Sequence, residues 1–263
     1  MPEKTLEKII REQVVNDYFT PNIKAEVIFD TLLTPCIVDI VKGQMDGSTE
    51  DLTFLTKEMS ILDNSGEDVK VSKVDYVLAA RSKVYLVELK TTDSSINDEQ
   101  ADAYRELCQG KDFGEILGRR LLSILGEGGR TFTLHLGAPS LWSDETLEQA
   151  FREIISKNKY HGNTRGETCA EKAQTLIRVQ KWTQQGRYRS RKYLYTLGQL
   201  TDYLHAGGTL WDKPMEVLYL TPDGNAPEGF KGLSLRKFSG CGDYAKFLSD
   251  IFEGIYGKRN DHA

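Results

Sequence analysis

The chain has 263 residues, of which 39% are hydrophobic, 28% charged and 10% aromatic, and its formal net charge is −5. This composition is typical of a globular protein with a sizeable core, built as one elaborated domain or two small ones. A net negative charge does not indicate general electrostatic binding of nucleic acid, so such a partner would have to be held by a local basic patch.

Membrane and extracellular features are not indicated. No apolar run approaches the ~20 residues that a membrane span needs, and the charged start MPEKTLEKIIREQ does not match a signal peptide. The four cysteines lie far apart and include no CxxC pair. We therefore expect a cytoplasmic protein with reduced thiols, no membrane partner and no zinc site. The widely spaced His135, His161 and His205 do not predict a metal cluster either.

The first half of the chain alternates between helical and strand patterns. Apolar spacing predicts helices over residues 5–19 and 22–33, the second ending before Pro35. A strand is predicted over 52–62, and after a turn at 64–68 a β-hairpin follows with strands at 72–80 and 83–91. The next helix is predicted over 97–109, with Asn97 as its N-cap and Gly110 just beyond its end.

Residues 111–212 are mainly helical by pattern. Helices are predicted over 113–125, 143–157, 166–182 and 193–204, and one strand over 130–137. A strand at 215–221 and an amphipathic helix at 243–256 complete the chain. We therefore predict an α/β protein whose core consists of residues 1–110 and 213–263, with a large, mainly helical insertion of unknown role at 111–212.

Two carboxylates and a lysine interrupt the apolar hairpin. If the turn centres on Arg81-Ser82, a symmetric register sets Asp75 opposite Glu88, with Cβ atoms roughly 4.5–5.5 Å apart, and Lys90 on the same face. Two anions ~5 Å apart repel by about 3 kcal/mol at an effective dielectric near 20. A divalent cation bound between the two carboxylates would turn this repulsion into a net attraction, and Mg²⁺ accepts one or two carboxylates together with waters. In the alternative interpretation, Glu88 and Lys90 form an exposed polar rim at the strand end.

The order of these residues resembles a known nuclease pattern. Asp75 followed by Glu88-Leu89-Lys90 at the end of an apolar strand resembles the PD-(D/E)xK superfamily of restriction-endonuclease-like nucleases, although the proline is absent. Gln100 and Tyr104 resemble the QxxxY motif of nuclease domains attached to bacterial recombination helicases, and spacing of four sets both on one helix face. Asn97-x-x-Gln100 is also a capping-box pattern, and Tyr104 has the alternative of packing in the core.

The resemblance implies a fold and an activity. Its αβββαβ core, a mixed sheet flanked by helices, corresponds to residues 20–110 and 213–225 and leaves the insertion uncovered. The activity that it implies is Mg²⁺-dependent hydrolysis of phosphodiester bonds, with Mn²⁺ as a substitute and DNA as the expected substrate. A homodimer would suit a double-strand cutter.

The resemblance also assigns roles to residues. Asp75 and Glu88 would hold the metal, Lys90 would position or activate the attacking water, and Gln100 and Tyr104 would orient the scissile phosphate. Members of this superfamily often add an acidic residue from the first helix, for which Glu26 is our candidate and Glu12 is nearly as good.

A basic segment with interleaved aromatic residues is the best candidate for a nucleic-acid grip. In an extended conformation, the alternating Arg187, Arg189 and Arg191 would share one side; a solvated surface is the alternative. The basic residues of the segment are Lys181, Arg187, Arg189, Arg191 and Lys192.

A second class of function remains open. The chain would then be a catalytically silent module that uses a nuclease fold for binding or assembly, since fold does not fix function. A related alternative is a defence component whose nuclease is activated by a partner.

Overall fold

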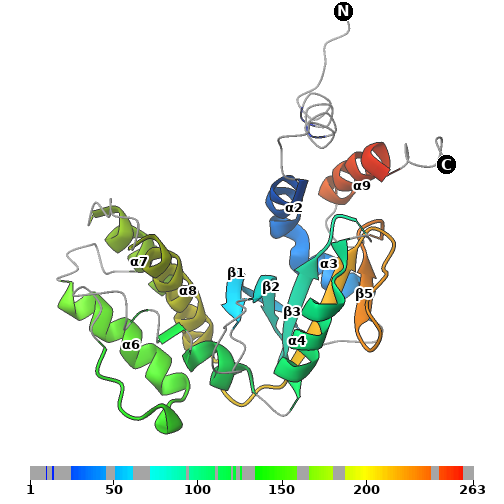
Figure 1. Cartoon of the computed structure of the whole chain (residues 1–263). Helices are drawn as coiled ribbons and strands as arrows, with labels where there is room; N and C mark the ends of the chain where they lie inside the picture. The colour runs from blue at the N-terminus through cyan, green and yellow to red at the C-terminus, as the bar shows by residue number, and fades with distance from the viewer. Residues whose placement is uncertain are drawn as a thin grey trace, which may run out of the picture. The chain divides into compact units, whose positions relative to one another are not determined.

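The computed structural model describes residues 25–45, 51–61, 72–92, 95–109, 112–119, 121–122, 125, 134–158, 166–179, 187–237 and 243–256, together with Ile10 and Val14, both helical. The described elements appear in Figure 1 in the following order: α2 (Ala25–Leu33), the 3-10 turn η1 (Thr34–Cys36), α3 (Ile37–Gln44), β1 (Thr53–Ile61), β2 (Ser72–Ala79), β3 (Val84–Leu89), α4 (Asp98–Cys108), the π-helical turn η3 (Gly114–Gly118), the 3-10 turn η4 (Pro139–Leu141), α6 (Asp144–Lys157), α7 (Cys169–Val179), α8 (Arg187–His205), β4 (Met215–Thr221), β5 (Lys231–Ser234) and α9 (Asp243–Tyr256).

The strands form one mixed sheet in the order β1-β2-β3-β4-β5. Ala80 N–H donates to the Lys83 carbonyl at 2.9 Å, so the β2–β3 turn centres on Arg81-Ser82, as predicted. On the other side of β3, Val84 N–H donates to Pro214 O and Lys90 N–H to Leu220 O, both at 2.9 Å. The equal six-residue steps on the two strands make β3 and β4 parallel, and β5 is parallel to β4. The predicted α/β architecture, a mixed sheet flanked by helices, is confirmed.

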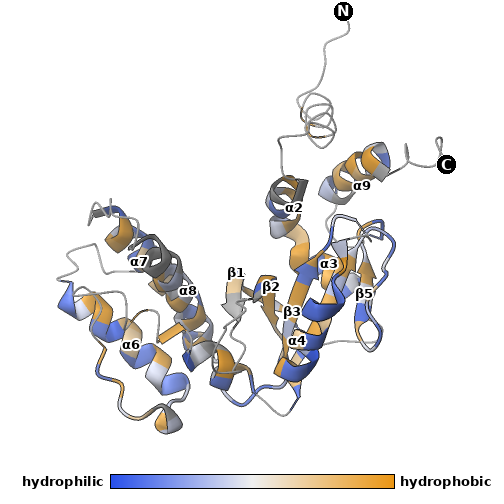
Figure 2. Ribbon diagram, viewed as in Figure 1, coloured by the Kyte–Doolittle hydropathy of each residue, from blue (hydrophilic) through white to orange (hydrophobic). Residues whose placement is uncertain are grey.

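The chain divides into two compact units. The first consists of Met1–Phe54, Leu86–Asp102 and Val217–Ala263, and the second of Leu55–Tyr85 and Ala103–Glu216. Strands β1, β3 and β4 and helix α4 contribute residues to both. Every residue of β3 is buried, and Figure 2 shows hydrophobic colour along most of this strand.

The core of the first unit includes a contact between helices that are distant in sequence. Helix α9 buries Leu248, Ile251, Phe252 and Ile255, which recur at helical spacing. The Phe252 ring stacks on Phe29 of α2 with the centroids 4.9 Å apart, and the two helices lie side by side in Figure 1. The predicted amphipathic helix therefore packs its apolar face against α2.

Two elements of the first unit are absent from the sequence prediction, α3 and β5. The Gln44 side chain at the end of α3 connects them, since its amide nitrogen donates to Ser234 O at 2.9 Å and its oxygen accepts from Ser234 N–H at 2.7 Å. These paired hydrogen bonds fix α3 against the edge strand β5.

In the second unit, helices α6, α7 and α8 pack on one another. Helix α6 starts at a capping box formed by Ser143 and Thr146 and buries Leu147, Phe151 and Ile154. Helix α8 approaches α7 closely at Gly198, where a Cβ would lie only 2.8 Å from the Cys169 carbonyl oxygen. Figure 1 shows α7 and α8 side by side.

Some predictions fail in this unit. Leu134–Gly137 form no strand, so the strand expected over 130–137 is wrong there; residues 130–133 lie outside the described part of the chain. Helix α8 begins at Arg187, not at 193, so the basic segment is helical from that residue on.

Within the described ranges, no helix is both long and apolar enough to cross a membrane.

Candidate functional site

The acidic and basic residues at the end of β3 are buried. Glu88 is 4% exposed and Lys90 9%, so the alternative of an exposed polar rim is wrong. The Lys90 backbone is anchored to β4 by its hydrogen bond to Leu220. Because Glu88 and Lys90 are two residues apart on an extended backbone, their side chains leave the sheet on the same face.

Glu88, Lys90 and Gln100 form a closed triangle of hydrogen bonds. Lys90 Nζ donates to Glu88 Oε1 at 2.8 Å and to Gln100 Oε1 at 3.0 Å, and Gln100 Nε2 donates to Glu88 Oε1 at 2.9 Å. The three side chains belong to β3, its end and the first turn of α4, all within the first unit. The fold thus brings together three of the predicted site residues, Glu88, Lys90 and Gln100.

The start of α4 explains how Gln100 reaches this position. Asn97 Oδ1 accepts hydrogen bonds from the N–H groups of Glu99 at 2.8 Å and Gln100 at 3.4 Å, which confirms Asn97 as the N-cap. Gln100 is therefore the third helical residue, and both polar atoms of its amide bond to the Glu88–Lys90 pair.

The hydrogen bonds of the triangle compensate for the removal of the Glu88 and Lys90 charges from water. A carboxylate removed from water is costly unless it is paired and hydrogen-bonded, and here one carboxylate oxygen accepts both an ammonium and an amide donor. Removing one partner would leave the other charge buried without its counter-ion.

The remaining motif residues have different surroundings. Tyr104 is 1% exposed, and its hydroxyl donates to the Lys73 carbonyl oxygen of β2 at 3.3 Å, which fits the alternative that Tyr104 packs in the core. Asp75 lies in β2, half-buried between the buried Val74 and Tyr76. Its pairing with Glu88 stays a prediction from the hairpin register.

The other acidic and basic candidates are less well defined. Glu26 is in α2, but its side chain lies outside the described residues, as do Glu12 and Lys181 entirely. The expectation that Arg187, Arg189 and Arg191 share one side of an extended segment is wrong, because residues two apart on a helix lie about 200° apart around its axis. Their part in binding nucleic acid, with Lys192, stays a prediction.

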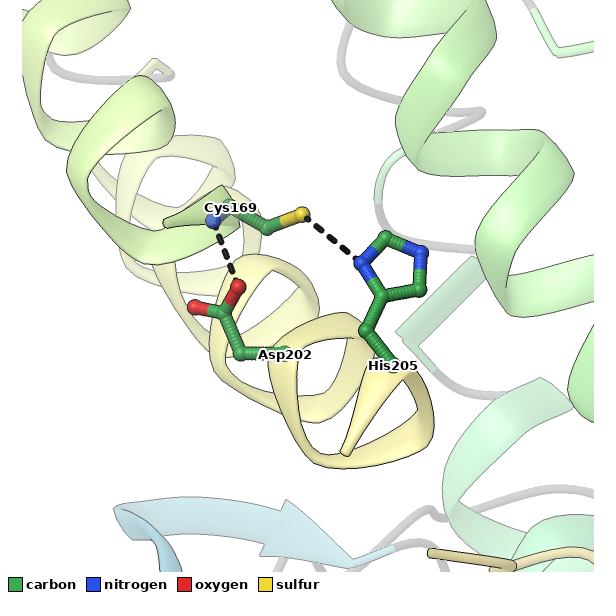
Figure 3. Close-up of side chains that lie close together, drawn as sticks. All are labelled: Cys169, Asp202 and His205. Carbon is green, nitrogen blue, oxygen red and sulfur yellow. Dashed lines mark hydrogen bonds between the residues drawn. The ribbon is translucent and has the colours of Figure 1, made fainter. Parts of the chain in front are cut away.

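A second cluster of reactive side chains lies between α7 and α8. Asp202 Oδ2 accepts from Ala170 N–H at 2.9 Å and Asp202 Oδ1 accepts from Cys169 N–H, so this carboxylate caps the start of α7. Cys169 Sγ lies 3.8 Å from His205 Nδ1. Figure 3 shows the sulfur and the imidazole directed toward each other, with the carboxylate beside the Cys169 backbone. Helix periodicity gathers this cluster, because Gly198, Asp202 and His205 recur at helical spacing.

The thiol in this cluster is not an activated nucleophile. Burial raises the pKa of Cys169 from 9.0 to about 12, and the Asp202 carboxylate adds to the increase. At neutral pH the thiol keeps its proton, whereas nucleophilic cysteines are thiolates. Histidine–histidine and cysteine–cysteine spacing alone does not predict this cluster; Asp202-x-x-His205 near the end of a predicted helix is the available sequence signal.

Comparisons with known proteins do not assign a family. No protein-family model matches the chain, and neither the curated proteins nor the solved structures gave a match.

Proposed function

We propose that this protein is a metal-dependent phosphodiesterase of the PD-(D/E)xK type, with DNA as its substrate. The observation that carries the proposal is the buried Glu88–Lys90–Gln100 triangle, in which three residues of the motif are joined by hydrogen bonds of 2.8 to 3.0 Å. A buried ion pair adds little net stability over an apolar pair of similar size, which favours a functional role for Glu88 and Lys90.

The order of elements supports the same proposal. A helix, the strands β1, β2 and β3, helix α4 and strand β4 follow the αβββαβ order that the resemblance implies. The long segment between α4 and β4 contains α6, α7 and α8.

The carboxylate at the strand end fits a magnesium ion. Mg²⁺ binds hard oxygen ligands and needs only one or two carboxylates, because waters and substrate phosphate oxygens complete its shell. Glu88 would hold the ion, with Asp75 as the second carboxylate if the hairpin register continues to that pair. When bound, Mg²⁺ would neutralise charge on the phosphate and make a coordinated water more acidic.

Lys90 and Gln100 would do the protein's part of the chemistry. An ammonium has three N–H donors, and among the described residues Lys90 gives two of them to Glu88 and Gln100. The third is suited to a phosphate oxygen or the attacking water. Gln100 holds both partners and would thereby fix the angle at which Lys90 faces the substrate.

Purified protein incubated with supercoiled plasmid or single-stranded DNA in Mg²⁺ or Mn²⁺ tests this proposal. We expect nicking or degradation that disappears in Glu88→Gln. The matched control is Glu216→Gln, since Glu216 of β4 also pairs with a lysine, Lys83 just before β3, at 2.7 Å but is about one-third exposed. Absence of cleavage in both metals, or equal cleavage by Glu88→Gln, would contradict the proposal.

A catalytically silent binding or assembly module is the second candidate. The observation in its favour is that the triangle satisfies Glu88 and Lys90 without an ion. Calorimetric titration with Mn²⁺ separates the two candidates: binding that is lost in Asp75→Ala supports the enzyme, and no binding by the wild type supports the module.

A further inference from the structure

We propose that Cys169, Asp202 and His205 form a binding site for a zinc-like transition-metal ion. The three residues offer a sulfur, a carboxylate oxygen and an imidazole nitrogen that all lie within 4.8 Å of one another. Zn²⁺ binds these three kinds of ligand atom. The site lies wholly in the second unit and is independent of the proposed phosphodiesterase site.

The spacing of the ligand atoms is close to that of a tetrahedral site. With bond lengths of about 2.3 Å to sulfur and about 2.05 Å to nitrogen, a tetrahedral angle separates the two ligand atoms by about 3.6 Å. Cys169 Sγ and His205 Nδ1 are 3.8 Å apart. A small rotation of either side chain therefore suffices for both to bind one ion.

The backbone holds the ligands in place. The absence of a side chain at Gly198 allows α8 to approach the start of α7, and Asp202, one turn later, caps that start through two N–H groups. Each carboxylate oxygen accepts one N–H there, and an ionised carboxylate has about four acceptor positions. Asp202 thus keeps acceptor capacity for a cation while it caps the helix.

The outer nitrogen of His205 faces a carboxylate, as it commonly does in zinc sites. His205 Nε2 lies 4.0 Å from Glu148 Oε2 of α6. With Nδ1 bound to the ion, Nε2 carries the proton and can donate it to Glu148 after a small shift, which fixes the ring orientation. The His205 side chain is 55% exposed, so an ion and a water in the fourth position have access from solvent.

The thiol selects the class of metal. A cysteine sulfur binds as the thiolate and favours zinc, cobalt or another transition metal over Mg²⁺. Binding releases the Cys169 proton to solvent and forms the metal–sulfur bond, with no change in oxidation state. The ion would connect α7 to α8 directly and α6 through Glu148.

Titration of the metal-free full chain with Co²⁺ or Zn²⁺ tests this proposal. We expect one thiolate-bound ion per chain, seen as a thiolate-to-cobalt charge-transfer band in the near ultraviolet that Zn²⁺ displaces and Mg²⁺ does not. Cys169→Ser should abolish the band. Glu148→Gln should lower the affinity for cobalt about tenfold, and His205→Gln should lower it at least as much. Circular dichroism of each variant checks that α6–α8 remain folded.

Two controls make the outcome decisive. Cys108→Ser removes a thiol of α4 outside the cluster and should leave the band unchanged. Glu88→Gln should also keep the charge-transfer band, since its carboxylate belongs to the other unit and is not a ligand at the Cys169 site. Absence of the band in the wild type, or a band that survives in Cys169→Ser, would overturn the proposal even if the chain cleaves DNA.

Discussion

The substitution Glu88→Gln tests whether the triangle at the end of β3 is a buried ion pair. Lys90 Nζ and Glu88 Oε1 are 2.8 Å apart, and the two side chains are only 11% and 6% exposed. Removing one charge of such a pair leaves the other uncompensated and costs about 3–5 kcal/mol. A glutamine at position 88 keeps the volume and an acceptor oxygen, so we expect a loss of about 3 kcal/mol in the free energy of unfolding.

Urea unfolding of the wild type and three variants measures this effect. Glu88→Leu combined with Lys90→Met removes both charges and should recover most of the loss, because an apolar pair of similar size often replaces a buried ion pair without cost. Glu216→Gln breaks the pair with Lys83, in which both side chains are about one-third exposed, and should cost less than about 1 kcal/mol. A Glu88→Gln variant no less stable than Glu216→Gln, or a double variant as unstable as the single one, would refute this reasoning.

Three further predictions concern the helices. Gly198→Ala forces a Cβ to within 2.9 Å of Ala170 Cα and should lower the unfolding free energy by about 1–3 kcal/mol in thermal or urea melts; an unchanged melt would contradict the close contact. Phe252→Ala removes the ring stacked on Phe29 and should cost about 3–5 kcal/mol by the same measurement, whereas a loss under about 1 kcal/mol would contradict that packing. The folded chain keeps the Cys169 proton up to about pH 12, whereas the unfolded chain loses it near pH 9, so the free energy of unfolding falls as the pH rises between these values. Metal-free Cys169→Ser lacks this group and should therefore lose less stability than the wild type over that range. Parallel pH profiles of the two proteins would contradict the assignment.

The strands were predictable because their patterns are local. Alternating and apolar runs gave β1 and β4 to within a residue at each end, and Arg81-Ser82 gave the hairpin turn. The pairing of Glu88 with Lys90 on one face follows from strand periodicity alone. The bond of Gln100 to both residues requires the packing of α4 against the strand, which spacing suggested but did not determine.

The sequence pattern does not predict helix α3, because Pro35 marks the end of the helix expected over residues 22–33. Proline is tolerated in the first turn of a helix, and here it sits in the 3-10 turn Thr34–Cys36, after which α3 begins. Strand β5 is only four residues long and contains Gly232, so it carries little pattern. The alternation of arginines at the start of α8 suggested an extended segment, but the apolar face of the long helix determined its conformation.

The cluster of Cys169, Asp202 and His205 depends on tertiary packing. Its ligand atoms come from the start of one helix and the end of another, 33 residues apart at the nearest pair. Sequence spacing identifies Asp202 and His205 as neighbours on one helix, but only the close approach at Gly198 brings Cys169 to them.

The rate of Mn²⁺-dependent plasmid nicking by Lys90→Met tests the central claim most directly. This variant keeps Glu88 but lacks the ammonium that is proposed to act on the water or phosphate, and general acid–base groups contribute about 10²–10⁴-fold to rates. With Lys83→Met as the control, we predict a rate at least about 100-fold below the wild type for Lys90→Met and a near-normal rate for the control. Equal rates for Lys90→Met and the wild type, at matched folding by circular dichroism, would contradict the assignment of a phosphodiesterase site to this triangle.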